Sequence, residues 1–331
     1  MTAVGLLRAD LPGGVYGAPE DWPRWEALLP HVLAATEHAQ SAFEDAPAGT
    51  ADNVAWLLDR AGTYLQMRAR FTEARDLLQR ALAIDEATHG PDHPAVAVSL
   101  GNLALVLQDL GDAAGALPLA ERALAIDEAV HGPGHPTIAT RLSVLATVLR
   151  DLGNAAGARP LLEKALAIDE AVHGPDHRDV ANRLSNLALV LRDLGDAAGA
   201  RPLVERALAI TEATHGPDHP TVAIRLNNLA TILRDLGDAA GARPLAERAL
   251  AITEAVHGPD HPNLAVCLNN LAMVLRDLGD AAGARPLLER ALAITEAVHG
   301  PDHPNAVLLR GNLPLLEGEG QGRHGESRSE P

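Results

Sequence analysis

Apolar residues recur at helical spacing along most of the chain. In residues 94–110 they include Val96, Leu100 and Leu103, which fits a period of 3.6 residues and predicts one helix. A second series of the same period covers residues 113–130 and predicts a second helix. The pattern therefore predicts pairs of helices joined by a short turn, and it predicts no strand.

The residues between the two helices favour a tight turn. Gly111 is the residue type that takes a left-handed backbone after a helix, and Asp112 can cap the next helix. Asn154 stands at the same position one unit later, and Asn is also a good cap. Pro118 lies inside the second helix, where we expect a bent, solvent-facing first turn.

The helix pair repeats every 42 residues without insertion or deletion. Residues 178–219 and 220–261 are identical at 34 of 42 positions, and residues 220–261 and 262–303 at 35 of 42. Equal units can stack on one another, so the sequence predicts an all-α fold, an α-solenoid of tandem helix–turn–helix repeats. The segment His-Gly-Pro-Asp-His-Pro, or a variant with one substitution, closes each unit and begins at His89, His131, His173, His215, His257 and His299.

The spacing of Leu103-Ala104, Leu107, Gly111 and Ala116 resembles the tetratricopeptide repeat signature. The string Leu-Asn-Asn-Leu-Ala at 226–230, together with Gly-Pro-Asp-His-Pro, is similar to the longer, kinesin-light-chain-like form of this repeat. The resemblance covers roughly residues 52–316. It implies a right-handed superhelix whose first helices line a concave groove for peptides or partner proteins.

The N-terminal part differs from the repeats. We expect a flexible segment over residues 1–20, then a capping helix and linker over 21–51, and six helix pairs over 52–303. The aromatic residues are confined to the part before residue 72, where we expect them to cover the apolar end of the stack. Residues 21–33 also resemble the stretch at which bacterial NTPase-linked signalling proteins enter their repeat arms.

The C-terminal part is shorter than a repeat. Residues 304–316 begin a seventh unit, in which Pro314 stands where alanine recurs and should break the helix. Residues 317–331 are polar and rich in glycine, and we expect a disordered tail.

Composition and charge narrow the functional classes. The chain has 27 basic and 44 acidic side chains, a net charge of −17, which argues against a nucleic-acid or anionic-membrane partner. Only 2% of the residues are aromatic, so alanine and leucine must supply the packing. Neither a secretion signal nor a stretch long enough to span a membrane is recognisable, and we expect a cytoplasmic protein.

The sequence offers no convincing catalytic, cofactor or metal site. Lys164 is the single lysine and follows Glu163, so no phosphate-binding loop of the Gly-Lys-Ser/Thr type exists. The repeated histidines, such as His89 and His93, flank a turn, which favours a helix-capping role over zinc binding. Cys267 occurs once, where other units carry serine or arginine, and we interpret it as a helix-surface residue. We expect no enzymatic activity, no cofactor and no bound metal.

The positions that vary between repeats indicate a binding surface. Six of the eight differences between residues 178–219 and 220–261 fall in the first helix, whereas the second helix hardly changes. Neutral drift at exposed positions is the alternative explanation. Mapped onto the family pattern, the concave positions comprise Thr140, Asn182, Ile224 and Val266, then Ser143, Ser185, Asn227 and Asn269, then Thr147, Leu189, Thr231 and Met273.

Two polar ladders accompany these positions. An asparagine amide both donates and accepts hydrogen bonds and so matches a peptide unit, and an arginine fork suits a carboxylate. We therefore predict a peptide-binding or protein-binding groove, whereas the alternative is that the arginines pair with neighbouring aspartates. The predicted groove residues are Asn102, Asn186, Asn227, Asn228, Asn269, Asn270, Arg150, Arg192, Arg234 and Arg276.

Three functions fit this sequence. The first is a non-enzymatic scaffold that binds a peptide or protein, with an extended acidic segment among the candidate partners. The second is a regulatory arm that docks onto a separate signalling ATPase. The third is self-association through the ends of the stack.

Overall fold

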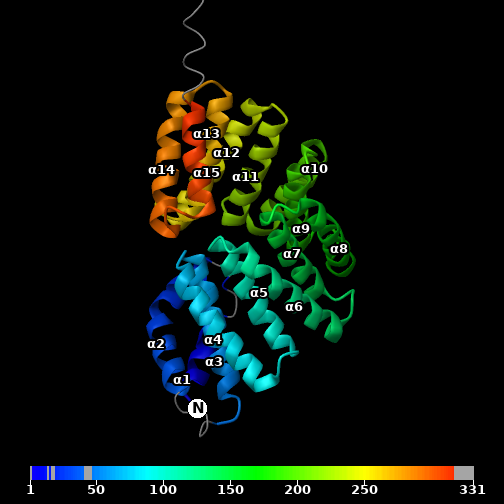
Figure 1. The fold of residues 1–331 in the computed structure, drawn as a ribbon, viewed down its shortest axis with the longest axis vertical. Helices are drawn as coiled ribbons and strands as arrows, with labels where there is room; N and C mark the ends of the chain where they lie inside the picture. Colours follow the sequence, from blue (N-terminus) through cyan, green and yellow to red (C-terminus); the bar gives the residue numbers. More distant parts are fainter. Residues whose placement is uncertain (1, 13–14, 16–18, 41–46, 317–331) are drawn as a thin grey trace, which may run out of the picture. The chain divides into compact units, whose positions relative to one another are not determined.

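The computed structural model describes residues 2–12, 15, 19–40 and 47–316, which form α-helices and short 3-10 helices with no strand among them. The predicted all-α class is confirmed. The chain divides into two compact units, residues 1–175 and 176–331. Within each unit, consecutive helices run back and forth as antiparallel pairs (Figure 1).

The first unit contains eight α-helices among its described residues. The first is α1, which lies near the start of the chain and is followed by a short 3-10 helix, η1, over Pro19–Asp21. Three helix pairs then follow α2. The bounds are α1 Ala3–Asp10, α2 Trp22–Gln40, α3 Thr50–Met67, α4 Phe71–His89, α5 Pro94–Asp109, α6 Ala113–His131, α7 Pro136–Asp151 and α8 Ala155–His173.

The second unit contains three helix pairs and a shorter last helix among its described residues. From α5 to α14 every first helix has 16 residues and every second helix has 19. The bounds are α9 Arg178–Asp193, α10 Ala197–His215, α11 Pro220–Asp235, α12 Ala239–His257, α13 Pro262–Asp277, α14 Ala281–His299 and α15 Pro304–Asn312.

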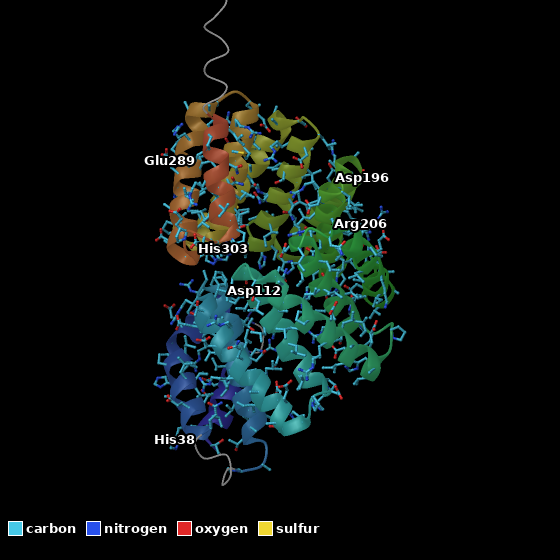
Figure 2. All side chains as sticks on the ribbon, viewed as in Figure 1. His38, Asp112, Asp196, Arg206, Glu289 and His303 are labelled. Atoms are coloured by element: carbon cyan, nitrogen blue, oxygen red, sulfur yellow. The ribbon has the colours of Figure 1, made fainter. Side chains whose placement is uncertain are left out.

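The turn inside each pair has the geometry that its residues predict. After α5, Gly111 takes φ +79°, and the Asp112 amide donates to the Leu107 carbonyl at 2.8 Å, so the last carbonyls of the helix are satisfied. Asp112 Oδ1 then accepts a hydrogen bond from the Gly115 amide at 2.8 Å and caps α6. A Cβ at Gly115 would lie 2.3 Å from Asp112 Oδ2, which explains why glycine recurs there. Asp112 and Asp196 mark this position in Figure 2.

The core of each pair is built from alanine and leucine. Ala104 on α5 and Ala116 and Ala123 on α6 are completely buried, and Leu100 is buried with them. A methyl side chain at these positions lets two helices approach closely, so the core is filled without aromatic rings. Pro118 is exposed and α6 continues through it, as expected for a solvent-facing position.

The N-terminal helices cover the first repeat. On α2, Trp25 is completely buried, and its ring stacks on that of Tyr64 in α3 with centroids 6.1 Å apart. This position of Trp25 and Tyr64 fits the predicted capping role, which stays a prediction. Residues 1–20, expected to be flexible, include the helix α1, which packs against α2 and α3 because Val4 on its inner side is buried. The expected linker falls partly on residues 41–46, outside the described residues.

The C-terminal helix is cut short as Pro314 predicts. Helix α15 ends at Asn312, and residues 313–316 form the 3-10 helix η3. Val307 on α15 is 54% exposed, although the equivalent Ala223 and Ala265 are buried between helices of the same unit. Self-association through this end stays a prediction, and the predicted tail at 317–331 lies outside the described residues.

Replacing Asp238 by alanine should lower the free energy of unfolding by about 1 kcal/mol, because Asp238 Oδ1 accepts a hydrogen bond from the Gly241 amide at 2.8 Å and caps α12. Asp238→Asn is the matched control, since Asn154 caps α8 in the same way at 3.0 Å. Urea denaturation followed by circular dichroism measures both. An alanine variant as stable as wild type would show that the cap contributes nothing.

Candidate functional site

The first helices of neighbouring repeats present a continuous surface within each unit. Side chains 43 residues apart meet across this surface. In the second unit, Asn228 Nδ2 donates to Ser185 Oγ at 3.0 Å, and Asn312 Nδ2 donates to Asn269 Oδ1 at 2.9 Å. In the first unit, Asn102 Nδ2 donates to Asp59 Oδ1 at 2.7 Å.

We call this surface the ladder face. It comprises an outer row and three inner rows of first-helix positions. The outer row is Val98, Thr140, Asn182, Ile224, Val266 and Leu308, and the inner rows are those that begin at Gly101, Asn102 and Leu105 and recur every 42 residues.

The predicted asparagines lie on the ladder face, and some of their amide groups form hydrogen bonds within the chain. Asn228 and Asn270 are half-buried, whereas Asn227 is buried and its Oδ1 has no hydrogen-bond partner. The Asn270 Oδ1 accepts from Asn269 Nδ2 at 3.3 Å. In the second unit the structure therefore brings Asn227, Asn228, Asn269 and Asn270 together on α11 and α13, with Asn186 on α9. Asn102 lies on the corresponding face of α5 in the first unit.

The predicted arginines form a row of matched charges. Arg234 lies 3.2 Å from Asp235 on its own helix and 3.6 Å from Asp277 on the next first helix. Arg192 pairs in the same way with Asp193 and Asp235, Arg276 pairs with Asp277, and Arg150 pairs with Asp151. The guanidinium groups are half-buried, and these aspartates balance their charge. Pairing of the arginines with neighbouring aspartates is the alternative that the sequence left open.

The outer row exposes apolar side chains. Ile224 is 47% exposed and Val266 is 46% exposed. Thr231 and Met273 of the inner rows are buried, so the variable positions differ in their access to a ligand. An exposed apolar row beside half-buried amides can contact both the side chains and the backbone of an extended chain.

The ladder face of the first unit ends in a pocket of about 300 Å³ between α1, α3, α4 and α5. Trp56 lines it, with the guanidinium carbons of Arg8 and Arg60 at 5.4 Å and 6.0 Å from its rings. Burial raises the pKa of Asp59 and of Asp85. The remaining polar lining comprises Asp52, His89 and Ser99.

Trp56 is the residue whose place the sequence reasoning missed. It was grouped with the capping aromatics, but it lies 42 residues before Val98 and so occupies the outer row of the ladder face. Aligning the divergent first repeat on the later ones would have found this position.

Cys267 is not a surface residue, and its sequence interpretation is wrong. It is 5% exposed, and its Sγ lies 3.4 Å from Thr253 Oγ1 on the preceding second helix. The equivalent Arg141 is also buried, because its Nε donates to the buried Asp127 at 2.7 Å. Ser99, Arg141 and Cys267 occupy this position, and each lies against a polar partner 14 residues earlier, which the apolar periodicity does not reveal.

The second histidine of each pair caps a helix, as the sequence favoured. His93 Nδ1 accepts a hydrogen bond from the Ala95 amide at 3.2 Å at the start of α5. The His89 and His93 rings stack with centroids 4.3 Å apart. Burial, with a smaller effect of His303, lowers the pKa of His299 to about 4.

Comparisons with known proteins identify the family of these repeats. The tetratricopeptide repeat family matches residues 53–129, 99–171, 137–213, 179–253, 223–297 and 268–329. No curated protein sequence matches the chain. None of the described helices has both the length and the apolar character needed to cross a membrane.

Three solved structures illustrate the likeness. BtubC (BKLC) from P. vanneervenii is 25% identical over 71% of this chain and 92% of its own, with a TM-score of 0.50. A Podosopora anserina protein with nearly identical TPR-like repeats, assigned as a kinesin light chain, is 26% identical over 62% of this chain and 97% of its own, with a TM-score of 0.48. A Rap protein complexed with competence and sporulation factor is 16% identical over 89% of this chain and 96% of its own, with a TM-score of 0.57.

The Cys267 thiol should react with a thiol reagent at least about tenfold more slowly in the native protein than in denaturant, because the group is buried and its burial raises the thiol pKa. A colour-forming disulfide reagent measures both rates. Equal rates would mean that α13 does not pack against α12 as described.

Acidification should destabilise the protein through His299. Its unfolded pKa is about 6.5, and its folded pKa is about 4. The unfolded chain therefore binds the proton first, and stability falls as pH decreases from about 6.5 to about 4. Urea midpoints of wild type and His299→Gln measure the effect.

The comparison with His299→Gln is needed because the titration of Asp109 changes the stability of the fold with pH in the opposite direction. Burial raises the pKa of Asp109 to about 6, so this carboxyl stabilises the fold at low pH and loses that contribution as pH rises through about 6. Wild type should lose stability relative to His299→Gln as the pH decreases from about 6.5 to about 4. Parallel curves for the two proteins would contradict the role of His299.

Proposed function

The chain belongs to the tetratricopeptide repeat family, and we propose that it is a non-enzymatic scaffold whose ladder face binds an extended peptide or protein segment. The family is typically used for protein–protein interaction. The Rap protein of similar fold was solved with competence and sporulation factor bound, which supports the idea that such helix pairs can hold a ligand.

The observation that carries the proposal is where the repeats differ. The outer row changes from Asn182 to Ile224 to Val266, and these side chains are half-buried or exposed on the ladder face. The second helices and the buried alanines stay nearly the same, because they must match the next unit. A constant scaffold with a variable face is the arrangement expected when sequence changes adjust which ligand the face binds.

The amides of this face have hydrogen-bonding capacity to spare. Asn228 donates one hydrogen bond to Ser185, and among the described residues its Oδ1 accepts none. Asn270 accepts one from Asn269, and its Nδ2 donates none to the described residues. One free acceptor and one free donor on neighbouring helices can bind the N–H and C=O groups of an extended backbone.

The test is a selection from a displayed random peptide library against the purified protein. Selected peptides should bind wild type and lose at least about tenfold in affinity to the double variant Ile224→Glu, Val266→Glu, because a desolvated carboxylate replaces each apolar contact. Isothermal titration calorimetry measures the affinities.

The matched control is the double variant Val130→Glu, Val172→Glu. These valines are 51% and 48% exposed but lie at the ends of second helices, away from the ladder face. Its peptide affinity should equal that of wild type. A library that yields no binder, or equal losses in both double variants, would contradict the proposal.

A further inference from the structure

The pocket between α1, α3, α4 and α5 lies where the chain fills the equivalent place with its own side chain one repeat later. Arg141 on α7 stands 42 residues after Ser99, which lines the pocket. Arg141 Nε donates to the buried Asp127 on α6 at 2.7 Å. Its guanidinium also lies against Gly101 on α5, because a Cβ at Gly101 would overlap Arg141 Nη1. A guanidinium therefore occupies the space between α5, α6 and α7.

The same three positions carry two acids and a short side chain at the pocket. Asp85 on α4 is the counterpart of Asp127, and its Oδ2 accepts a hydrogen bond from Ser99 Oγ at 2.7 Å. Asp59 on α3 is the counterpart of Gly101 and also lines the pocket. Because serine is much shorter than arginine, the space that a guanidinium fills in the next repeat stays open here, with a volume of about 300 Å³.

The other charged groups of the pocket each have a charged or polar neighbour of their own. Asp52 Oδ1 lies 3.0 Å from His89 Nε2, and Asp59 Oδ2 lies 3.9 Å from Arg60 Nε. Arg8 Nη1 donates to an asparagine of α3 at 2.7 Å. These contacts leave Asp85 as the pocket carboxylate without a basic partner.

Asp85 is a buried carboxylate that lacks the counter-charge of its counterpart. It is 8% exposed, and among the described residues no arginine or lysine pairs with it. Burial raises the pKa of Asp85 and of Asp59, because neither is neutralised by a guanidinium in the way that Arg141 neutralises Asp127. Buried charges in proteins are normally paired, so a cation in the pocket would complete the arrangement.

The shape of the pocket favours an organic cation. Its lining runs from exposed Arg8 and Val98 to buried Asp85, so a long side chain can reach the acids from the surface. The described histidine and acidic side chains of the pocket do not place three ligand atoms within 4.8 Å of one another, which argues against a metal ion.

We propose that this pocket binds a guanidinium group of a ligand between Asp85 and Asp59, in the place that the Arg141 guanidinium takes one repeat later. A planar guanidinium can donate to two carboxylates at once, whereas an ammonium group is a single point of charge. An arginine side chain of a protein segment and a free guanidine compound supply the same group. The inference goes beyond the proposed function and holds whether or not the ladder face binds a segment.

The first experiment follows the indole N–H signal of Trp56, which lines the pocket, by nuclear magnetic resonance during titration with N-acetylarginine amide at constant ionic strength. The signal, assigned with Trp56→Phe, should shift and saturate, while those of the buried Trp22 and Trp25 stay unchanged. N-acetylcitrulline amide has nearly the same shape without the charge and should bind at least about tenfold more weakly. A stationary Trp56 signal, or equal affinities of the two compounds, would overturn the inference.

Two variants alter the charge of the pocket. Ser99→Arg supplies a guanidinium from the chain itself, as Arg141 does, and should abolish the response of Trp56. Asp85→Asn keeps an oxygen that can accept from Ser99, and it should weaken binding of the arginine compound at least about tenfold and remove the preference over citrulline.

The matched control is Asp76→Asn, which removes the same charge from an exposed position of α4 and should leave the affinity unchanged. An undiminished affinity in Ser99→Arg or in Asp85→Asn would overturn the proposal. If Ser99→Arg does not fold, the comparison of Asp85→Asn with Asp76→Asn decides.

Two further probes distinguish the sources of the group. The peptide acetyl-Gly-Gly-Arg-Gly-Gly-amide should bind at least about tenfold more tightly than methylguanidinium chloride if a protein segment is the source, because its backbone also contacts the exposed edge of the pocket at Val98. Equal affinities identify a small guanidine compound as the source. Either result upholds the pocket, and failure of both probes to shift Trp56 overturns it.

Discussion

The structure depends on close contact between helices at positions where only a methyl group fits. Ala104, Ala116 and Ala123 are fully buried at the interfaces within the first unit, and a larger side chain there would push the helices apart. Because each helix pair must match the next one, the same restriction applies in every repeat. This explains why the second helices are nearly constant and why variation is left to the outward side of the first helices. The surface proposed for ligand binding is thus defined by the packing behind it.

The fold could be predicted almost completely from the sequence, because its signals are local. Gly111 and Asp112 each act within a few residues, so the turn and the helix starts follow from residue type. The same holds for His93, whose capping bond reaches only two residues along the chain. The helix α1 was missed because eight residues with one buried valine give a weak periodic signal.

The candidate site was predicted less well, because its properties depend on contacts between repeats. The asparagine and arginine ladders could be read from a 42-residue period, but their bonds to Ser185 and Asp277 run across neighbouring helices. The burial of Cys267 and Arg225 depends on a second helix 14 residues earlier, and a polar residue gives no hydrophobic signal of its own burial. A search for coupled substitutions at that spacing would have found the pair of Asp127 and Arg141, and with it the absence of an arginine at Ser99.

The constant repeat length has a genetic consequence. Nearly identical coding segments in tandem invite unequal recombination, and an exchange between two second helices would remove or add whole units while leaving every turn and interface intact. Loss of two units between Asp127 and Arg225 would set these residues 14 apart, so that Asp127, which now pairs with Arg141, would pair with Arg225. Recombination alone could thus change which charged residues of this protein pair with one another, without a single point mutation.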